Sequence, residues 1–367
     1  MGPPVPSEAS PPKPEQKLTP VHYEHTGNFV GLLEQLRLSL LVSTYQAGKV
    51  LAVGTHAGAI AISFHNFEQA MGVAVKPGRV AVGTRRQIWT LRSAPDLAAR
   101  IEPAGQYDAC FLTRSAHYTG PIHGHELTWS GDELWIVNTL FSCLCTLQEE
   151  YSFVPRWRPP FISALAAEDR CHLNGMALVA GRPRYVTALA ECDTPAGWRP
   201  TKATSGCLID VDSGQVIARG LAMPHSPRVH DHRLWVLDSG HGRLSVVDAA
   251  GGRVEPVAHL KGYTRGLALH GGFAFIGLSR IRETSVFGGI PIAEHRDQLQ
   301  CGVTVVDLQS GRQVAALVFH SGVEEVFAVQ TLPGVRCPTL AGPLHEADGY
   351  PSIWLVPQPG ERGVSTP

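Results

Sequence analysis

The sequence predicts an all-β fold, because one short pattern recurs along most of its 367 residues. The pattern is an apolar strand, a tight turn with Gly or Asp, and a second apolar strand that ends on a small or polar residue. Five clear copies read GVAVKPGRVAVGT from Gly72, ELTWSGDELWIVNT from Glu126, GMALVAGRPRYVTAL from Gly175, PRVHDHRLWVLDS from Pro227 and GLALHGGFAFIGLS from Gly266. A worn copy, EVFAVQTLPGV, begins at Glu325. The copies start roughly 40 to 60 residues apart, close to the ~40 to 50 residues of one β-propeller blade.

Further strands follow each copy and complete a four-stranded antiparallel sheet, as in IDVDSGQVIARG and VVDLQSGRQVAALVF. The last copy has only one clear strand. Residues 38–65, by contrast, hold three strands without an inner partner: LSLLVSTY, GKVLAVGTH and GAIAISFH. Joining these strands gives a sixth blade built from both ends of the chain, which closes the ring and removes open sheet edges. We therefore expect a six-bladed β-propeller closed by strands from both termini.

The composition divides the chain into one domain and two ends. Residues 1–22 are rich in Pro, Ser and Glu and predict a disordered lead-in, residues 23–345 form the propeller, and residues 346–367 form a C-terminal tail. The lead-in lacks the apolar core of a signal peptide, and no segment is apolar over the length of a bilayer. The eight cysteines include no CxxC pair, which favours a reducing cytoplasm, with Cys143 and Cys145 as packing residues.

The formal net charge is -1 and the pI is about 7.0. Such a balance creates no field that would attract phosphate backbones or anionic lipids, so nucleic acid and membranes are not expected as main partners. A small molecule or a peptide is the expected partner. The sequence gives no indication of the oligomeric state.

Strand order predicts where a site lies. In each blade the turn between the first two strands is short, whereas the long connections cover residues 105–124, 150–172, 190–205 and 280–300. The long connections belong to the face on which the first strand of each blade begins. Variable loops over a rigid scaffold commonly form a binding mouth, so we expect the site at this end of the axis.

Polar residues open the first strands at that mouth. They include His125 and Glu126, His172 and Asn174, His225 and Ser226, Thr264 and Arg265, and Glu324 and Glu325, while Asn138 and Asp238 end neighbouring second strands. Imidazoles with a carboxylate are ligands of zinc and of non-haem iron, and they suit calcium poorly. We therefore expect a divalent metal, Fe or Zn, held by His125, His172, His225 and Glu325. The alternative for each histidine is a hydrogen bond between neighbouring blades.

Other residues complete the expected site. Glu126, Asn174 and Arg265 are the candidate catalytic residues. The candidate substrate-binding residues are Arg265, Asn138, Asp238, Trp198 and Arg282, with Arg265 and Arg282 as anchors for an anionic group. The alternative for the arginines at the mouth is structural pairing with carboxylates such as Glu168, Asp169 and Glu283.

These residues predict a metal-dependent enzyme whose site is the axial mouth, an oxidoreductase of the non-haem iron type acting on a small or peptidyl substrate. Two alternatives stay open. One is a zinc-dependent hydrolase, and the other is a non-catalytic propeller that binds a peptide or protein through the same mouth, because a fold alone does not fix a function.

Several distinctive runs carry a resemblance to a known family. They include VSTYQAGK from Val42, CHLNG from Cys171, MPHSPR from Met223, FGGIPIAE from Phe287 and CGVTVVDLQSG from Cys301. In these runs the chain resembles a mostly bacterial family of conserved hypothetical proteins, catalogued as a domain of unknown function, over roughly residues 35–345. The resemblance implies a propeller-like fold and brings no established activity.

Overall fold

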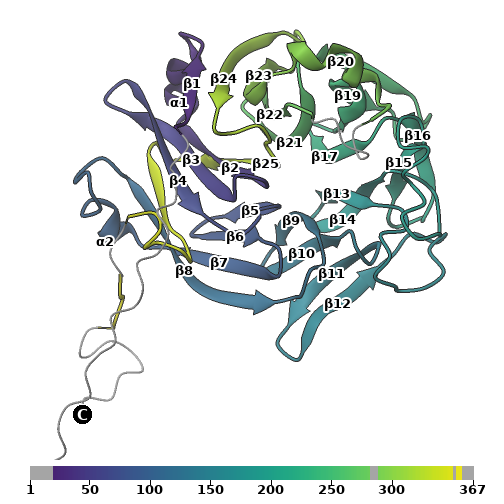
Figure 1. Cartoon of the computed structure of the whole chain (residues 1–367), viewed down its shortest axis with the longest axis horizontal. Helices are drawn as coiled ribbons and strands as arrows, with labels where there is room; N and C mark the ends of the chain where they lie inside the picture. The colour runs from purple at the N-terminus through teal and green to yellow at the C-terminus, as the bar shows by residue number, and fades with distance from the viewer. Residues whose placement is uncertain (1–19, 282–287, 350–352, 358–367) are drawn as a thin grey trace, which may run out of the picture.

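The computed structural model describes residues 20–281, 288–349 and 353–357. Six antiparallel sheets surround a central axis, with the first strand of each copy of the pattern innermost (Figure 1). The innermost strands contact one another around the ring. The prediction of a six-bladed β-propeller is confirmed.

Each blade is named here by its order in the ring, with its strands given from the axis outward. Blade 1 holds β5 (Val73–Lys76), β6 (Arg79–Gly83), β7 (Gln87–Ser93) and β8 (Ala109–Tyr118). Blade 2 holds β9 (Gly124–Ser130), β10 (Glu133–Asn138), β11 (Cys143–Gln148) and β12 (Tyr151–Trp157). Blade 3 holds β13 (Leu173–Val179), β14 (Arg182–Ala188), β15 (Gly206–Asp210) and β16 (Val216–Leu221).

The second half of the ring continues in the same way. Blade 4 holds β17 (Pro224–His230), β18 (Arg233–Asp238), β19 (Arg243–Val247) and β20 (Val254–His259). Blade 5 holds β21 (Tyr263–His270), β22 (Phe273–Ser279), β23 (Cys301–Asp307) and β24 (Gln313–Ser321). Blade 6 holds β25 (Ala328–Pro333), β2 (Leu38–Thr44), β3 (Lys49–His56) and β4 (Ala59–Asn66).

Blade 6 closes the ring as expected, because β25 from the C-terminal part pairs antiparallel with β2 from Leu38↔Pro333 to Ser43↔Ala328. Two further strands were not predicted. β1 (His22–His25) adds a fifth, antiparallel strand to β24, and β26 (Pro338–Ala341) runs parallel to β8. Both cover the outer edge of a blade, so the two ends of the chain brace three blades instead of one.

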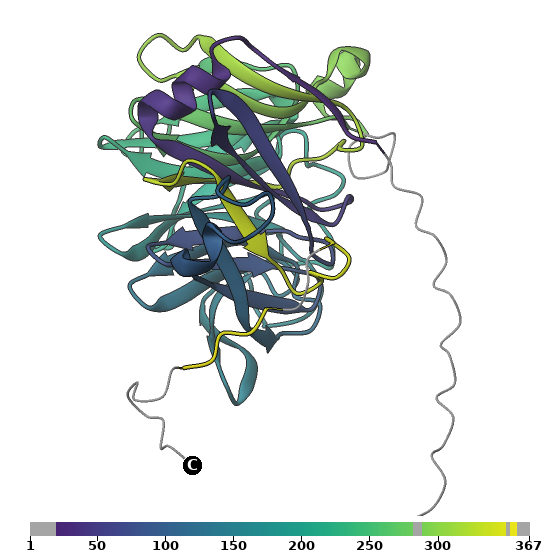
Figure 2. The same cartoon turned by 90° about the vertical axis from the view of Figure 1, so that its left-hand side faces the viewer.

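Helices contribute little. α1 (Phe29–Leu36) buries Phe29, Val30 and Leu33, and Phe29 and Leu33 belong to the apolar core that blades 5 and 6 share. This helix lies on the flank of the disc (Figure 2). α2 (Pro95–Ala98), η1 (Ser239–His241) and η2 (Pro291–Gln298) are short helices within connections. In the described residues, no helix is long and apolar enough to cross a membrane.

In blades 1 to 5 the turn between the first two strands is tight, whereas β25 and β2 of blade 6 come from opposite ends of the chain. In blades 3, 4 and 5 the two central turn residues all have positive φ: Ala180 and Gly181, Asp231 and His232, and Gly271 and Gly272. This is the geometry of two-residue hairpins whose twist matches that of the strands. Two expected long connections are corrected. Residues 105–124 contain β8, so only residues 119–123 join blade 1 to blade 2 at the mouth, and residues 150–172 contain β12, so residues 158–172 join blade 2 to blade 3.

Candidate functional site at the axial mouth

Sheet register shows which residues of the inner strands are equivalent. Gly124 pairs with Asn138, Leu173 with Ala188, Pro224 with Asp238 and Thr264 with Leu278. The residue after each of these inner positions points toward the axis, as does the residue before it, because alternate residues of a strand share a face. The mouth therefore carries two rings of side chains, one above the other.

The deeper ring, here the inner ring, consists of Met71, His125, Asn174, His225, Arg265 and Phe327. The ring nearer the loops, here the outer ring, consists of Gln69, His123, His172, Met223, Tyr263 and Glu325. His125 and His225 are thus equivalent, whereas the residue equivalent to them in blade 3 is Asn174. The expectation that His172 shares their position is corrected: it lies two residues earlier, above Asn174.

The three histidines among the four expected metal ligands each have an Nδ1 atom held by an oxygen. His125 Nδ1 lies 3.0 Å from the His123 carbonyl oxygen, and His225 Nδ1 lies 2.8 Å from that of Met223. His172 Nδ1 lies 2.9 Å from both carboxylate oxygens of Asp169. An Nδ1–H that donates to oxygen leaves the Nε2 lone pair of a neutral imidazole available.

The surroundings keep two of these rings neutral. Burial lowers the pKa of His125 and of His225 well below the usual range, and the positive charge of Arg265 lowers both further. The rings of His125 and His172 pack edge to face with centroids 4.9 Å apart. Within the described residues, however, no group of three or more His, Cys, Asp or Glu side chains is close enough to hold a metal ion.

Arg265 is the buried cation of the inner ring, with only 9% of the residue exposed. Its guanidinium carbon lies 3.4 Å from the centroid of the Phe327 ring, a cation–π stack. Its one hydrogen bond in the described part of the chain runs from Nη1 to Glu325 Oε1 over 3.4 Å, which is long. Burial lowers the pKa of Arg265.

Glu126 was expected to be catalytic, but its carboxylate is engaged deeper on the axis. It forms an ion pair with Arg228 Nη2, and its Oε2 accepts a hydrogen bond of 2.9 Å from the Met176 N–H. Arg228 in turn donates to the carbonyl oxygens of Leu267, Met176 and Pro227. These contacts join blades 2, 3, 4 and 5, so the pair is a structural clasp at the axis.

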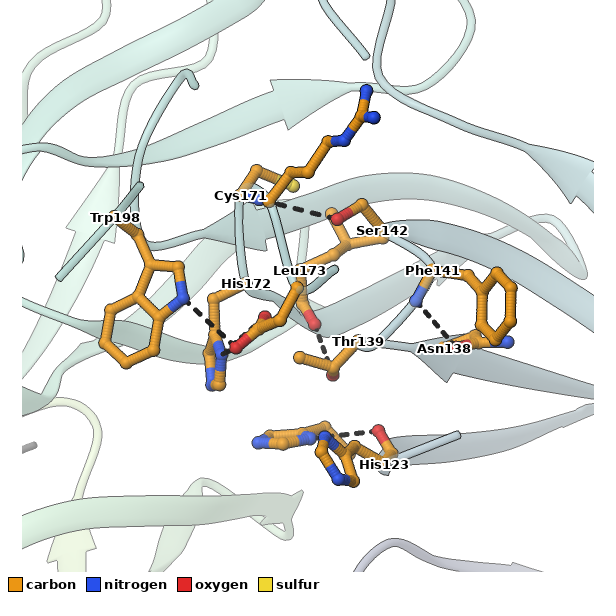
Figure 3. Close-up of polar contacts among 12 residues, drawn as sticks. His123, Asn138, Thr139, Phe141, Ser142, Cys171, His172, Leu173 and Trp198 are labelled. Carbon is orange, nitrogen blue, oxygen red and sulfur yellow. Dashed lines mark hydrogen bonds and ion pairs between the residues drawn. The ribbon is translucent and has the colours of Figure 1, made fainter. Parts of the chain in front are cut away.

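Two expected substrate-binding residues support loops instead. Asn138 is completely buried, and its Oδ1 accepts from the Phe141 N–H at 3.1 Å (Figure 3). Asp238 accepts from the Ala222 N–H at 2.8 Å and lies 2.8 Å from His241 Nδ1. Because their oxygens are used at the ends of second strands, neither carries an oxygen into the mouth.

Trp198 likewise holds other residues of the mouth in place, namely Asp169 and His172. It is 2% exposed in an apolar cluster of mouth loops, and its Nε1–H donates to Asp169 Oδ2 over 3.1 Å. Trp198 and His172 both contact this one carboxylate. Their rings lie next to each other (Figure 3), with centroids 4.4 Å apart. The prediction that Trp198 stacks on a ligand is therefore corrected: it stacks on His172. Arg282 lies outside the described residues.

Asn174 faces the axis, and its side-chain amide uses its oxygen but not its nitrogen in hydrogen bonds among the described residues. Its Oδ1 accepts from the Thr187 hydroxyl at 2.7 Å, whereas its buried Nδ2 has no hydrogen-bond partner in the structure. His125, Asn174, His225 and Arg265 line a narrow cavity along the axis. Its volume open to the centre of a water molecule is about 10 Å³, roughly what a single water needs. A larger ligand therefore has to sit at the mouth, above the inner ring.

Sequence reasoning missed Tyr45 and Phe327, and it considered Asp169 only as a partner of arginines, whereas its carboxylate contacts His172 and Trp198. Phe327 stacks on Arg265 and lies 6.0 Å from the Tyr45 ring and 5.3 Å from the His125 ring, measured between centroids. The only signal for Phe327 was its place in the worn copy of the pattern, at the position of His125. Asp169 and Tyr45 come from loops, where no periodicity marks them.

Comparisons with known proteins agree with this fold. A chain in the crystal structure of a nidogen/laminin complex is 10% identical, with a TM-score of 0.51 over 81% of this chain and 99% of that one. A protein of unknown function from Bacteroides caccae is also 10% identical, with a TM-score of 0.51 over 80% and 98% of the two chains. Identities this low show the fold alone. No curated protein matches the chain.

A family model described as a domain of unknown function matches residues 27–341, from the residues just before α1 to the end of β26. The match covers all six blades and both rings of the mouth. It confirms the resemblance drawn from the CHLNG and MPHSPR runs, whose residues carry His172, Asn174 and His225. The chain belongs to the DUF4915 family, a domain of unknown function.

Proposed function

We propose that the axial mouth binds a small molecule or a peptide end that carries a carboxylate, with Arg265 as its anchor. The observation that supports this is the state of the guanidinium, which is buried and stacked yet makes a single long hydrogen bond within the described residues. Arg265 pairs with Glu325 only through this one long contact of 3.4 Å. A ligand carboxylate would add two parallel N–H···O bonds to the same buried charge.

The neutral imidazoles would supply the rest of the specificity. With Nδ1 fixed, the Nε2 atoms of His125 and His225 accept hydrogen bonds from hydroxyl or amine groups of the ligand. Their strongly lowered pKa makes them weak bases at neutral pH, whereas general base catalysis works best with a pKa near the working pH. This favours recognition, the role of a ligand-binding propeller, over acid–base catalysis.

A metal-dependent enzyme is the second candidate, as an iron oxidoreductase or a zinc hydrolase. One observation favours it: each of the three imidazoles is oriented through Nδ1 by an oxygen acceptor, which is how metal-binding histidines are commonly held. Elemental analysis of protein purified without chelator tests it. About one Fe or Zn per chain, lost in His125→Ala, would support this candidate, and metal-free wild type would remove it.

The carboxylate proposal is tested by calorimetry with N-acetylglycine and its neutral amide, which differ only in charge. We expect the acid to bind and the amide not to bind. Arg265→Gln should weaken binding at least about tenfold, since a hydrogen bond to a charged group contributes ~1.5 to 3 kcal/mol. Arg233→Gln, at an exposed arginine that begins β18, is the matched control. Equal binding of acid and amide would contradict the proposal.

We also place the protein in the cytoplasm. All eight cysteines are free thiols, and seven of them are buried. Unpaired thiols persist in a reducing compartment. Localisation of a fluorescent fusion in intact cells tests this part of the proposal.

A further inference from the structure

A second cavity lies beside the mouth, between blade 4 and the helix η2 that follows blade 5's second strand. Its volume is about 340 Å³, within the range of small-molecule sites. Buried side chains of Leu260, Ile292 and Leu299 form its apolar part. Helix η2 approaches closely because Gly242, with φ 65°, has no side chain: a Cβ there would lie 2.6 Å from Ile292 Cδ1.

The charged groups around this cleft are mostly basic. Arg243 and Lys261 line it, and neither forms an ion pair with a carboxylate among the described residues. Arg243 Nε is buried and has no hydrogen-bond partner among the residues that the structure describes. Glu294 is the single carboxylate residue in the lining, and it is exposed at the rim. A buried, unsatisfied guanidinium N–H beside a cavity favours an anionic ligand.

Three imidazoles add donors to the same cleft. His259 pairs with Arg243 across β19 and β20, so both side chains lie on the same face of blade 4. His241 Nδ1 lies 2.8 Å from Asp238 Oδ2, and exposed His295 contributes from η2. The cleft therefore combines two fixed positive charges and three imidazoles with an apolar wall.

We propose that this cleft binds a small molecule that carries a phosphate monoester on an apolar body. A phosphate monoester is close to a dianion at neutral pH, with oxygens for several donors, which matches the two unpaired cations and the adjacent imidazoles. The wall of Leu260, Ile292 and Leu299 takes the organic part of the ligand. No residue of the inner ring lines this cleft, so the site is separate from the axial mouth.

Calorimetry with phenyl phosphate, inorganic phosphate and benzoate tests the proposal on the full chain. Benzoate is compared with phenyl phosphate in the Arg265→Gln variant, so that carboxylate binding at the axial mouth does not contribute. We expect phenyl phosphate to bind with a Kd of about 1 mM or tighter, inorganic phosphate to bind more weakly, and benzoate to bind more weakly than phenyl phosphate. In the Arg243→Gln and Lys261→Gln double variant, phenyl phosphate binding should fall at least about tenfold.

The control removes the same two charges elsewhere. Arg182→Gln combined with Arg312→Gln changes two exposed arginines, one at the start of β14 and one in the turn between β23 and β24, and it should leave phenyl phosphate binding unchanged. Arg265→Gln should also leave it unchanged, which separates this cleft from the axial mouth. Absence of binding by wild type, equal binding of benzoate, or equal losses in both double variants would each overturn the proposal.

Discussion

The axis of the propeller carries two arginine–glutamate pairs that differ in how completely they are satisfied. Arg228 uses its guanidinium fully: it pairs with Glu126 and donates to three backbone carbonyls. Arg265 is more buried but has one 3.4 Å hydrogen bond to Glu325 and a stack on Phe327. The difference indicates that Arg228 holds blades together, whereas Arg265 retains hydrogen-bonding capacity for a ligand.

The largest expected effect comes from breaking the satisfied pair. Glu126→Gln keeps the shape of the side chain but leaves Arg228 without its counter-charge, and the loss of one partner of a buried pair costs ~3 to 5 kcal/mol. Urea unfolding should show a free energy of unfolding lower by this amount. A loss below about 1 kcal/mol would mean that the clasp is not structural and would remove the contrast with Arg265.

Acid provides the next effect, through a histidine outside the mouth. His65 of blade 6 is completely buried, and burial, with the charge of Lys49, lowers its pKa to about 3. The unfolded chain, with a pKa near 6.5, binds more protons between these values, so stability decreases as pH falls below ~6.5. From pH 6.5 to 5 we expect a loss of up to about 2 kcal/mol from this residue.

Two variants separate the contribution of His65 from that of the mouth histidines to the pH dependence of stability. His65→Gln should flatten the dependence of unfolding free energy on pH, whatever its effect at neutral pH. Arg265→Gln should reduce the part due to His125 and His225, because Arg265 is one cause of their lowered pKa. A slope between pH 5 and 6.5 unchanged by both substitutions would contradict the assigned protonation states.

A smaller effect tests the support beneath His172. Trp198→Phe removes the N–H that donates to Asp169 while it keeps most of the apolar contact. The loss of one hydrogen bond should lower the free energy of unfolding by ~1 kcal/mol. Chemical denaturation measures it, and His172→Phe is the companion variant. If Trp198→Phe instead abolishes carboxylate binding with unchanged stability, Trp198 contacts the ligand after all.

The smallest expected change in stability is that of Arg265→Gln, below about 1 kcal/mol. Burial already makes the charge costly, and the hydrogen bond that is lost is long. Thermal and urea unfolding of the variant beside Arg228→Gln measure the contrast directly. Equal, large losses in both variants would show that Arg265 is a second structural clasp.

The fold was predictable because its information is local. Alternating apolar residues and turn residues mark each hairpin. The three strands of residues 38–65 lack an inner partner, and the incomplete copy of the pattern from Glu325 supplies it. β1 and β26 were missed because HYEH and PTLA are four residues long and form strands only where a blade edge accepts them. Their pairing is a tertiary event without a sequence signal.

The site was predictable in position but less so in detail. The polar openings of the inner strands correctly placed His125, His225, Asn174 and Arg265 around one cavity. Which residue at the start of an inner strand faces the axis depends on how that strand pairs with the next one. The CHLNG run does not reveal that Asn174, and not His172, is equivalent to His125. Glu126 pairs with Arg228, and Asn138 and Asp238 accept hydrogen bonds from backbone N–H groups. These tertiary contacts could likewise not be predicted from the sequence.

We propose above all that Arg265 is the ligand anchor of the mouth. A crystal structure with 3-bromopropionate tests it most directly, because the anomalous signal of bromine locates the molecule without assumptions. We predict a bromine peak above the inner ring, with the carboxylate oxygens ~2.7 to 3.2 Å from the guanidinium nitrogens of Arg265, and its loss in Arg265→Gln. A peak confined to other sites, or one that persists at the mouth in Arg265→Gln, would contradict the account.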